Sequence, residues 1–163
     1  MSDTVAPGGP QGKPSDDAHA GRQQAMAVLA RASGKELAEA WQAWPDRPEV
    51  RPVRGPETGL VMVRGRIGGG GAPFNFGEAT VTRATVKLSN GKVGHAYALG
   101  ADKEKVRHAA IFDALWQDDA FRADVEKKLV APIRDRLEAE DNEHREETAA
   151  TRVDFFTMVR GED

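Results

Sequence analysis

The dipeptide Asn90-Gly91 separates two runs of alternating apolar residues, and it constrains the fold more than any other feature of the sequence. A type I′ turn needs positive φ at both central residues, and Asn-Gly meets that need well. The sequence therefore predicts a β-hairpin with a two-residue turn. In that register apolar residues face each other, with Leu88 opposite Val93, Val86 opposite His95, Ala84 opposite Tyr97 and Thr82 opposite Leu99.

The same register makes two predictions about the side chains of the hairpin. His95 lies on the apolar face, which favours a core histidine with satisfied hydrogen bonds over a metal ligand. The other face is basic but shallow, with Arg83 over Ala98. A flat or extended ligand could lie on it.

Apolar residues at helical spacing predict helices before and after the strands. The first covers residues 18–32, and Ser33 caps a second that runs through Trp44, with Glu36 at the spacing of a capping box. Further helices are expected over 102–116 and 121–130, and Pro132 suits the first turn of another. Residues 60–67 alternate as a strand. We therefore expect an α+β fold with a mainly antiparallel sheet, helices packed on one side, and a C-terminal helix followed by an extended arm.

Composition divides the chain into three parts. Residues 1–17 are rich in Pro, Gly and Ser, and we expect a disordered leader. Residues 18–131 are expected to form the α+β core domain. Residues 132–163 begin with a helix that carries Ile133 and Leu137 but is polar from residue 138, and a helix polar all round usually bridges space instead of covering a core.

The segment TRVDFFTMVRG, residues 151–161, carries large apolar side chains on both faces when it is read as a strand. Burial of each is worth roughly 1.5–3 kcal/mol, so the segment is expected to dock as an arm. Strand addition to a partner subunit is the preferred interpretation, and return to its own sheet is the competing one. The predicted partner-binding residues are Val153, Phe155, Phe156, Met158 and Arg160.

Charge is unevenly distributed along the chain. Residues 47–92 hold eight Lys or Arg against three Asp or Glu, whereas residues 102–163 hold eleven against seventeen. The basic middle suits an anionic ligand or an acidic partner, and the acidic remainder argues against nucleic-acid binding. The alternative is that both are ordinary solvated faces. The candidate ligand-binding residues are Arg64, Arg66, Glu78 and Arg83.

Several classes of site are excluded or disfavoured by the sequence. The chain has no cysteine, which rules out disulfides, thiolate zinc sites and an iron–sulfur cluster ligated by thiolates of this chain. Its four histidines lack the spacing of a metal site. The run Gly68 to Gly71 matches no phosphate-loop motif, and it is interpreted either as an anion-binding nest or as a loop between strands. We assign no catalytic residue and no metal.

Hydropathy argues against a membrane location. No apolar run reaches the roughly 20 residues of a membrane span, and the start of the chain does not read as a signal peptide. We therefore expect a cytoplasmic protein.

Three segments carry a resemblance to a known family. They are RQQAMAVLARA at residues 22–32, the strand region of residues 55–100 with Glu57-Thr58-Gly59-Leu60 and Gly77-Glu78-Ala79-Thr80, and TRVDFFTMVRG at residues 151–161. Together they resemble PhnG, the G subunit of the bacterial carbon–phosphorus lyase system. The resemblance covers residues 22–161 and leaves out the leader and most of the polar helix.

The resemblance implies a role in organophosphonate catabolism, in a core complex with H, I and J subunits. In that system the I subunit, helped by G and H, uses ATP and an alkylphosphonate to displace adenine from ribose C1. Methylphosphonate then gives α-D-ribose 1-methylphosphonate 5-triphosphate. The J subunit later cleaves the carbon–phosphorus bond with S-adenosylmethionine and an iron–sulfur cluster.

The expected function is therefore support of this transferase step by a subunit that is inactive alone and binds no cofactor by itself. ATP and the alkylphosphonate are expected to be substrates of the whole complex. Two alternatives stay open. One is a purely structural scaffold without ligand contact, and the other is an independent anion-binding module.

Overall fold

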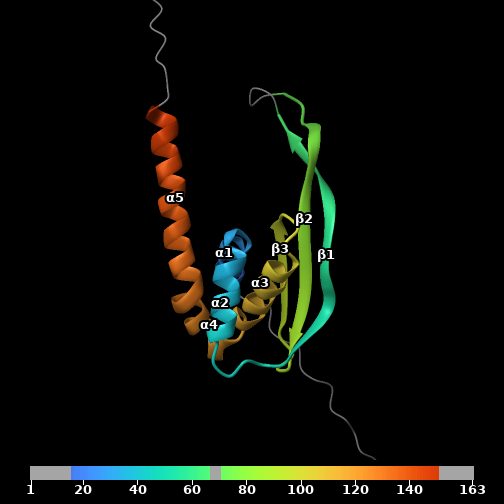
Figure 1. Cartoon of the computed structure of the whole chain (residues 1–163), viewed down its shortest axis with the longest axis vertical. Coiled ribbons are helices and arrows are strands. Elements are labelled where there is room, and N and C mark those ends of the chain that lie inside the picture. Colours follow the sequence, from blue (N-terminus) through green and yellow to red (C-terminus); the bar gives the residue numbers. More distant parts are fainter. Residues whose placement is uncertain (1–15, 67–70, 151–163) are drawn as a thin grey trace, which may run out of the picture.

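The computed structural model describes residues 16–66 and 71–150, which form a three-stranded antiparallel sheet in the order β1-β2-β3 with helices on one side (Figure 1). This confirms the predicted α+β class. Among the described helices, none is both long and apolar enough to span a membrane. The elements in chain order are α1 (Asp16–Arg31), α2 (Gly34–Ala43), β1 (Val50–Gly65), β2 (Phe74–Leu88), β3 (Val93–Leu99), α3 (Lys103–Trp116), α4 (Asp119–Val125), the π-helical turn η1 (Glu126–Val130) and α5 (Ala131–Ala150).

The start of α2 confirms the predicted capping box. The Ser33 hydroxyl accepts the Glu36 backbone N–H at 3.2 Å, and the Glu36 carboxylate accepts the Ser33 backbone N–H at 2.7 Å. Two backbone donors at the helix end are thereby satisfied without a partner from elsewhere. The other end of α2 packs inward, because Trp44 lies edge-on to Phe112 with ring centroids 5.6 Å apart.

Helix α3 lies at the centre of the core. Its backbone begins at the N-cap Asp102, whose side chain accepts the Lys105 N–H, and every residue from His108 to Trp116 is buried. A surface helix buries one stripe, whereas a helix covered on nearly all sides lies between layers. Helix α3 therefore lies between the sheet and the other helices.

The hairpin of β2 and β3 forms where Asn90-Gly91 predicts it, but the predicted turn type and register are wrong. Of the two residues Asn90 and Gly91, only Gly91 has positive φ, at 88°, and the Leu88 N–H donates to the Lys92 carbonyl at 2.9 Å. The loop thus has three residues, which moves the pairing by one position. The observed pairs are Lys87 with Val93, Val86 with Gly94, Thr85 with His95, Ala84 with Ala96, Arg83 with Tyr97, Thr82 with Ala98 and Val81 with Leu99.

This shift exchanges the two faces of β3. Gly94 and Ala98 are buried and Ala96 is half-buried, whereas Tyr97 is 53% exposed and Leu99 is 74% exposed. The physical reason is the closeness of α3. A Cβ atom on Gly94 would meet the carbonyl oxygen of Ala110 and would lie 2.6 Å from the Ala114 backbone nitrogen. Only the small residues of β3 fit beneath the helix.

Strand β1 is an edge strand, and its first half is irregular. Pro52 and Pro56 lack an N–H, which an edge position tolerates, and the register with β2 shifts between Pro52 and Arg54 and again between Arg54 and Glu57. From Glu57 to Val63 the pairing is regular. Beyond the last pair between β2 and β3, strands β1 and β2 continue together and project from the body (Figure 1).

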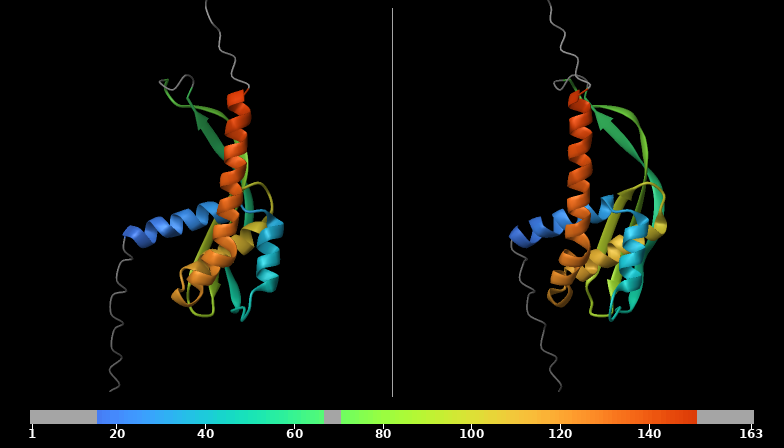
Figure 2. Two further views of the ribbon diagram at one scale, coloured as in Figure 1. Left: turned by 90° about the vertical axis from the view of Figure 1, so that its left-hand side faces the viewer. Right: turned by 60° about the vertical axis from the view of Figure 1, so that its left-hand side comes forward.

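Helix α5 projects from the same end of the body as this pair of strands (Figures 1 and 2). Its first turns are anchored in the core by Ile133 and Leu137, whereas residues 138–149 are almost entirely exposed, as the polar pattern predicts. The wide turn η1 precedes it. Pro132 has no N–H for the Lys128 carbonyl, and the Ala131 N–H donates to the Glu126 carbonyl five residues earlier.

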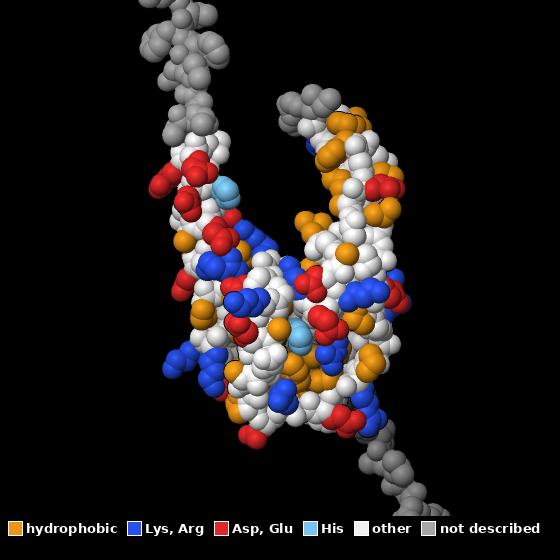
Figure 3. Space-filling model, in the orientation of Figure 1, with side chains coloured by type: hydrophobic (Ala, Val, Ile, Leu, Met, Phe, Trp, Pro, Cys, Tyr) orange, Lys and Arg blue, Asp and Glu red, His pale blue; other side chains and the backbone are white. Residues whose placement is uncertain are grey.

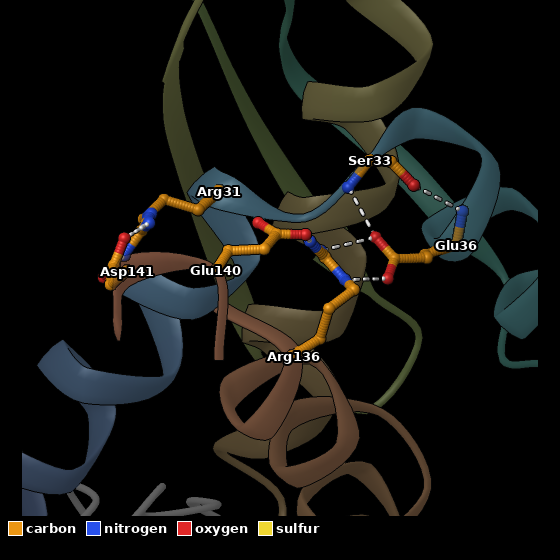
Figure 4. A network of polar contacts seen from close by, with 6 residues as sticks. All are labelled: Arg31, Ser33, Glu36, Arg136, Glu140 and Asp141. Carbon is orange, nitrogen blue, oxygen red and sulfur yellow. Dashed lines mark hydrogen bonds and ion pairs between the residues drawn. The ribbon is translucent and has the colours of Figure 1, made fainter. Parts of the chain in front are cut away.

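Ion pairs attach α5 to the two N-terminal helices (Figure 4). The Arg136 guanidinium donates to both oxygens of Glu36, at 2.8 and 3.0 Å, and the Arg31 guanidinium donates to both oxygens of Asp141. Partial burial acts to raise the pKa of Glu36, but hydrogen bonds from Ser33 and Arg136 outweigh it and leave the pKa below its ordinary value. Glu36 thus both caps α2 and anchors α5.

Candidate functional site

The outer face of the sheet, which faces away from the helices, carries one cluster of charged side chains. Arg83 of β2 donates to Glu57 Oε2 of β1 from Nε at 3.2 Å and from Nη2 at 3.1 Å. Arg54 Nε lies 3.9 Å from the other oxygen of the same carboxylate. Glu57 therefore lies between two guanidinium groups, and all three side chains are about half exposed.

A shallow depression of about 310 Å³ lies beside this cluster. Its form follows from the strand pairing, because Gly59 lies opposite Val81 and contributes no side chain. Arg83, Glu57 and Tyr97 form part of its border. An anionic ligand here would compete with Glu57 for the Arg83 guanidinium, and the Tyr97 hydroxyl could add a hydrogen bond.

The structure places Arg83 differently from the sequence-based expectation. The shifted register sets it opposite Tyr97 and not over Ala98. The predicted basic but shallow face is therefore flanked by an aromatic ring. Sequence reasoning also left Glu57 without a partner, because the arginine that it pairs with is 26 residues away.

The other three candidate ligand-binding residues do not join this cluster. Arg64 pairs with Asn75, which is eight positions from Arg83 along β2, or about 26 Å in an extended strand. Arg66 follows the end of β1. Glu78 lies opposite Met62 and has no ion-pair partner within the described residues. The four residues thus lie at separate levels of the same pair of strands and do not form a single site.

The histidine that the sequence places in the core is exposed, and another histidine is buried. His95 is exposed on the outer face, where Nδ1 lies 3.1 Å from the Thr85 hydroxyl, so the expectation of a core histidine was wrong. His108 is the buried one, and desolvation lowers its pKa. In the part of the chain that the structure describes, no three His, Asp or Glu side chains gather as metal ligands would.

A buried carboxylate that sequence reasoning missed lies at the contact of α1, β3 and α3. Asp113 is 1% exposed, and its oxygens accept bidentate hydrogen bonds from Arg22 at 2.9 and 2.7 Å. One of these oxygens also accepts the His95 backbone N–H at 2.8 Å. The sequence did contain a signal for this carboxylate, because an Asp within the apolar run Ile111–Trp116 indicates a buried acid that needs a partner. Because its hydrogen bonds are made within the chain, we interpret Asp113 as a structural residue.

The predicted partner-binding residues Val153, Phe155, Phe156, Met158 and Arg160 lie outside the described residues, as does Gly68 to Gly70 of the glycine run. The described residues thus present an exposed charged surface beside a shallow depression on the outer face of the sheet. Two elements project from the body, the pair β1–β2 and helix α5. Neither the charged surface nor the depression encloses a small molecule in the way that most active sites do.

Comparison with known proteins assigns the chain to a family. The family model described as "Phosphonate metabolism protein PhnG" matches residues 20–161. A relative from Rhizobium meliloti (strain 1021), named "Alpha-D-ribose 1-methylphosphonate 5-triphosphate synthase subunit PhnG", is 66% identical over 152 residues, which is 93% of this chain and 97% of the relative. A match of this extent covers the core, the projecting elements and the last segment together. The chain belongs to the PhnG family.

Proposed function

We propose that this chain is a subunit of an α-D-ribose 1-methylphosphonate 5-triphosphate synthase. The observation that carries the proposal is the 66% identity to a subunit of that name over nearly the full length of both chains. In this role the complex uses ATP and methylphosphonate, releases adenine, and has its catalytic centre on another subunit. The partners are the H, I and J subunits of a cytoplasmic core complex, and this chain binds no cofactor alone.

The described surface fits a helper subunit better than it fits an independent anion-binding module. The charged cluster beside the depression is internally paired, since Glu57 already accepts from Arg83, and the depression itself is shallow. A module that bound an anion alone would need donors left free for the ligand. We propose the same division of the chain as the sequence suggests, with a leader at 1–17, a core domain at 18–131, and a polar helix with a docking arm at 132–163. The last two residues of the leader, Asp16 and Asp17, lie in α1.

The direct experiment is reconstitution. Adenine release from ATP and methylphosphonate is measured for the isolated chain and for the chain co-expressed with the H, I and J subunits. We expect release only from the complex. Turnover by the isolated chain would contradict the proposal, and saturable ATP binding by the isolated chain, followed by calorimetry, would favour an independent binding module.

We propose that Arg83 contacts an anionic group when the complex is assembled. Among the candidate ligand-binding residues, it is the one chosen for substitution. Arg83→Ala is expected to lower adenine release about 10-fold, since a hydrogen bond from a charged donor is worth roughly 1.5 kcal/mol or more. Lys92→Ala is the matched control, because Lys92 is exposed at the hairpin loop. The stability of the isolated chain should change by about 0–1 kcal/mol, because the Arg83–Glu57 pair is exposed. Equal activity of the two variants would show that Arg83 forms only a surface ion pair.

We also propose that residues 151–161 dock on a partner subunit, which places Val153, Phe155, Phe156, Met158 and Arg160 in an interface. The support is that α5 is exposed and polar over its last three turns, so it offers this segment no apolar surface. Deletion of residues 151–163 is expected to abolish co-purification with the partners. The melting temperature of the isolated chain should stay the same. A large fall in that temperature would show that the segment belongs to the core of its own chain.

A further inference from the structure

The part of the sheet that projects from the body is a two-stranded ribbon, defined here as residues 60–65 of β1 and 74–80 of β2. Strand β3 ends its pairing at Val81 with Leu99, so no third strand among the described residues extends along the ribbon. Figures 1 and 2 show the ribbon extending beyond α1 to α4, with α5 projecting from the same end of the body. Two strands alone are marginally stable in water, and they usually need a third strand or a packed helix.

The ribbon is also unusually apolar for an exposed element. Its large apolar side chains Leu60, Met62, Phe74 and Phe76 are 64, 55, 43 and 63% exposed. Figure 3 shows hydrophobic side chains on both sides of the projecting ribbon. Four such side chains expose on the order of 400 Å² together, which is the size of patch that marks interaction sites on soluble proteins.

We propose that the ribbon inserts into a groove of another protein subunit of the synthase, and this inference rests on the proposed function. The groove is apolar and covers both faces of the ribbon. It carries carboxylates near the end of the ribbon, because Arg64 and Arg66 lie there with no carboxylate partner within the described residues. The contact is separate from that of residues 151–161, so the chain holds its partners at two places.

A second copy of this chain fits the ribbon less well. A standard protein interface buries about 1,200–2,000 Å² in total, whereas two ribbons packed face to face would bury less than about 800 Å² of these side chains and would leave the outward sides exposed. Residues 138–149 of α5, the other projecting element, hold six Asp or Glu against one Arg, so a partner that reaches both elements needs basic groups on that side.

The experiment compares two pairs of exposed apolar residues in the full chain. The ribbon pair is Leu60→Ser with Phe76→Ser, and the control pair is Val53→Ser with Leu99→Ser, which are 62 and 74% exposed outside the ribbon. Each tagged chain is co-expressed with the H, I and J subunits, and the recovered subunits are identified and quantified by mass spectrometry. We expect the ribbon pair to lower recovery at least about 10-fold, as loss of buried hot-spot side chains does, and the control pair to leave it unchanged.

Hydrogen exchange provides a second readout that does not depend on mutants. The ribbon amides are expected to exchange quickly in the isolated full chain and to become protected in the complex. Normal recovery with the ribbon pair, or equal loss with both pairs, would overturn the inference while leaving the proposed function intact. If the wild-type chain forms a homodimer and the ribbon double substitution makes it monomeric, the inference is overturned in favour of a second copy. Ribbon protection in the isolated chain that disappears on deletion of residues 151–163 would overturn it in favour of the chain's own end. A wild-type chain that recovers none of the subunits would overturn the proposed function and this inference with it.

Discussion

Gly94→Ala should destabilise the isolated chain by about 3 kcal/mol or more, or prevent folding altogether. The added methyl group would meet the backbone of α3 at the Ala110 carbonyl oxygen and at the Ala114 nitrogen, and it would lie 2.8 Å from the Ala114 Cβ. A helix backbone cannot yield as a flexible side chain can, so α3 must separate from the sheet. Overpacking of a tight core costs about 1–3 kcal/mol even when side chains adjust.

A matched substitution separates this steric effect from the general effect of replacing glycine in a strand. Gly77 of β2 also has negative or extended φ, and a Cβ atom there has no neighbour within 4 Å. Gly77→Ala is therefore expected to be neutral or slightly stabilising. Urea unfolding of both variants measures the difference. Similar stabilities of the two would contradict the close packing of α3 on β3.

Asp113→Ala is expected to cost about 3–5 kcal/mol in unfolding free energy. Removal of one partner of a buried ion pair leaves the other charge unpaired, and here it also strips a hydrogen bond from the His95 backbone N–H. The hydrogen bonds with Asp113 raise the pKa of Arg22 against the opposing effect of its burial. An arginine keeps its charge in a protein even without such a partner, so the guanidinium of the variant cannot escape the penalty by losing a proton.

The control for this prediction is an ion pair of similar length at the surface. Asp124 accepts from Lys128 Nζ at 2.7 Å, with both side chains about half exposed. Asp124→Ala should cost no more than about 1 kcal/mol. A denaturant series on the two variants tests the contrast, and equal losses would mean that Asp113 is not the central tie between α1, β3 and α3.

The features that sequence predicted correctly are determined by a few neighbouring residues. The capping box needs only Ser33 and Glu36, and the buried face of α3 follows from the spacing of Ile111, Phe112 and Leu115. The location of the hairpin follows from Asn90-Gly91. Its register does not, because loops of two and three residues are both compatible with that dipeptide. The choice is made by α3, which accepts only the small residues of β3.

The candidate site was predictable in residue type but not in arrangement. Arg83 was identified, whereas its pairing with Glu57 depends on the irregular register of β1, which two proline residues and two shifts set. The wide separation of Arg64 from Arg83 was not predictable either. Alternation of apolar and polar residues predicts which face of a strand a residue lies on, but it does not predict how far the strand extends beyond its sheet. The Arg22–Asp113 pair joins residues 91 positions apart, beyond the reach of any local pattern.

Helix α5 acts as a lever because the contacts that anchor it in the body lie toward one end. Ile133 and Leu137 are buried in the core, and Arg136 and Asp141 pair with α2 and α1. A helix of 20 residues is about 30 Å long, so a tilt of about 10° at its base moves its far end by about 5 Å. Small changes in two surface ion pairs, which ionic strength weakens, are thus amplified into displacements the size of a side chain at Ala150. The position of Ala150 is thus set by salt bridges at Asp141 and Arg136, which lie about 14 and 21 Å away along the helix.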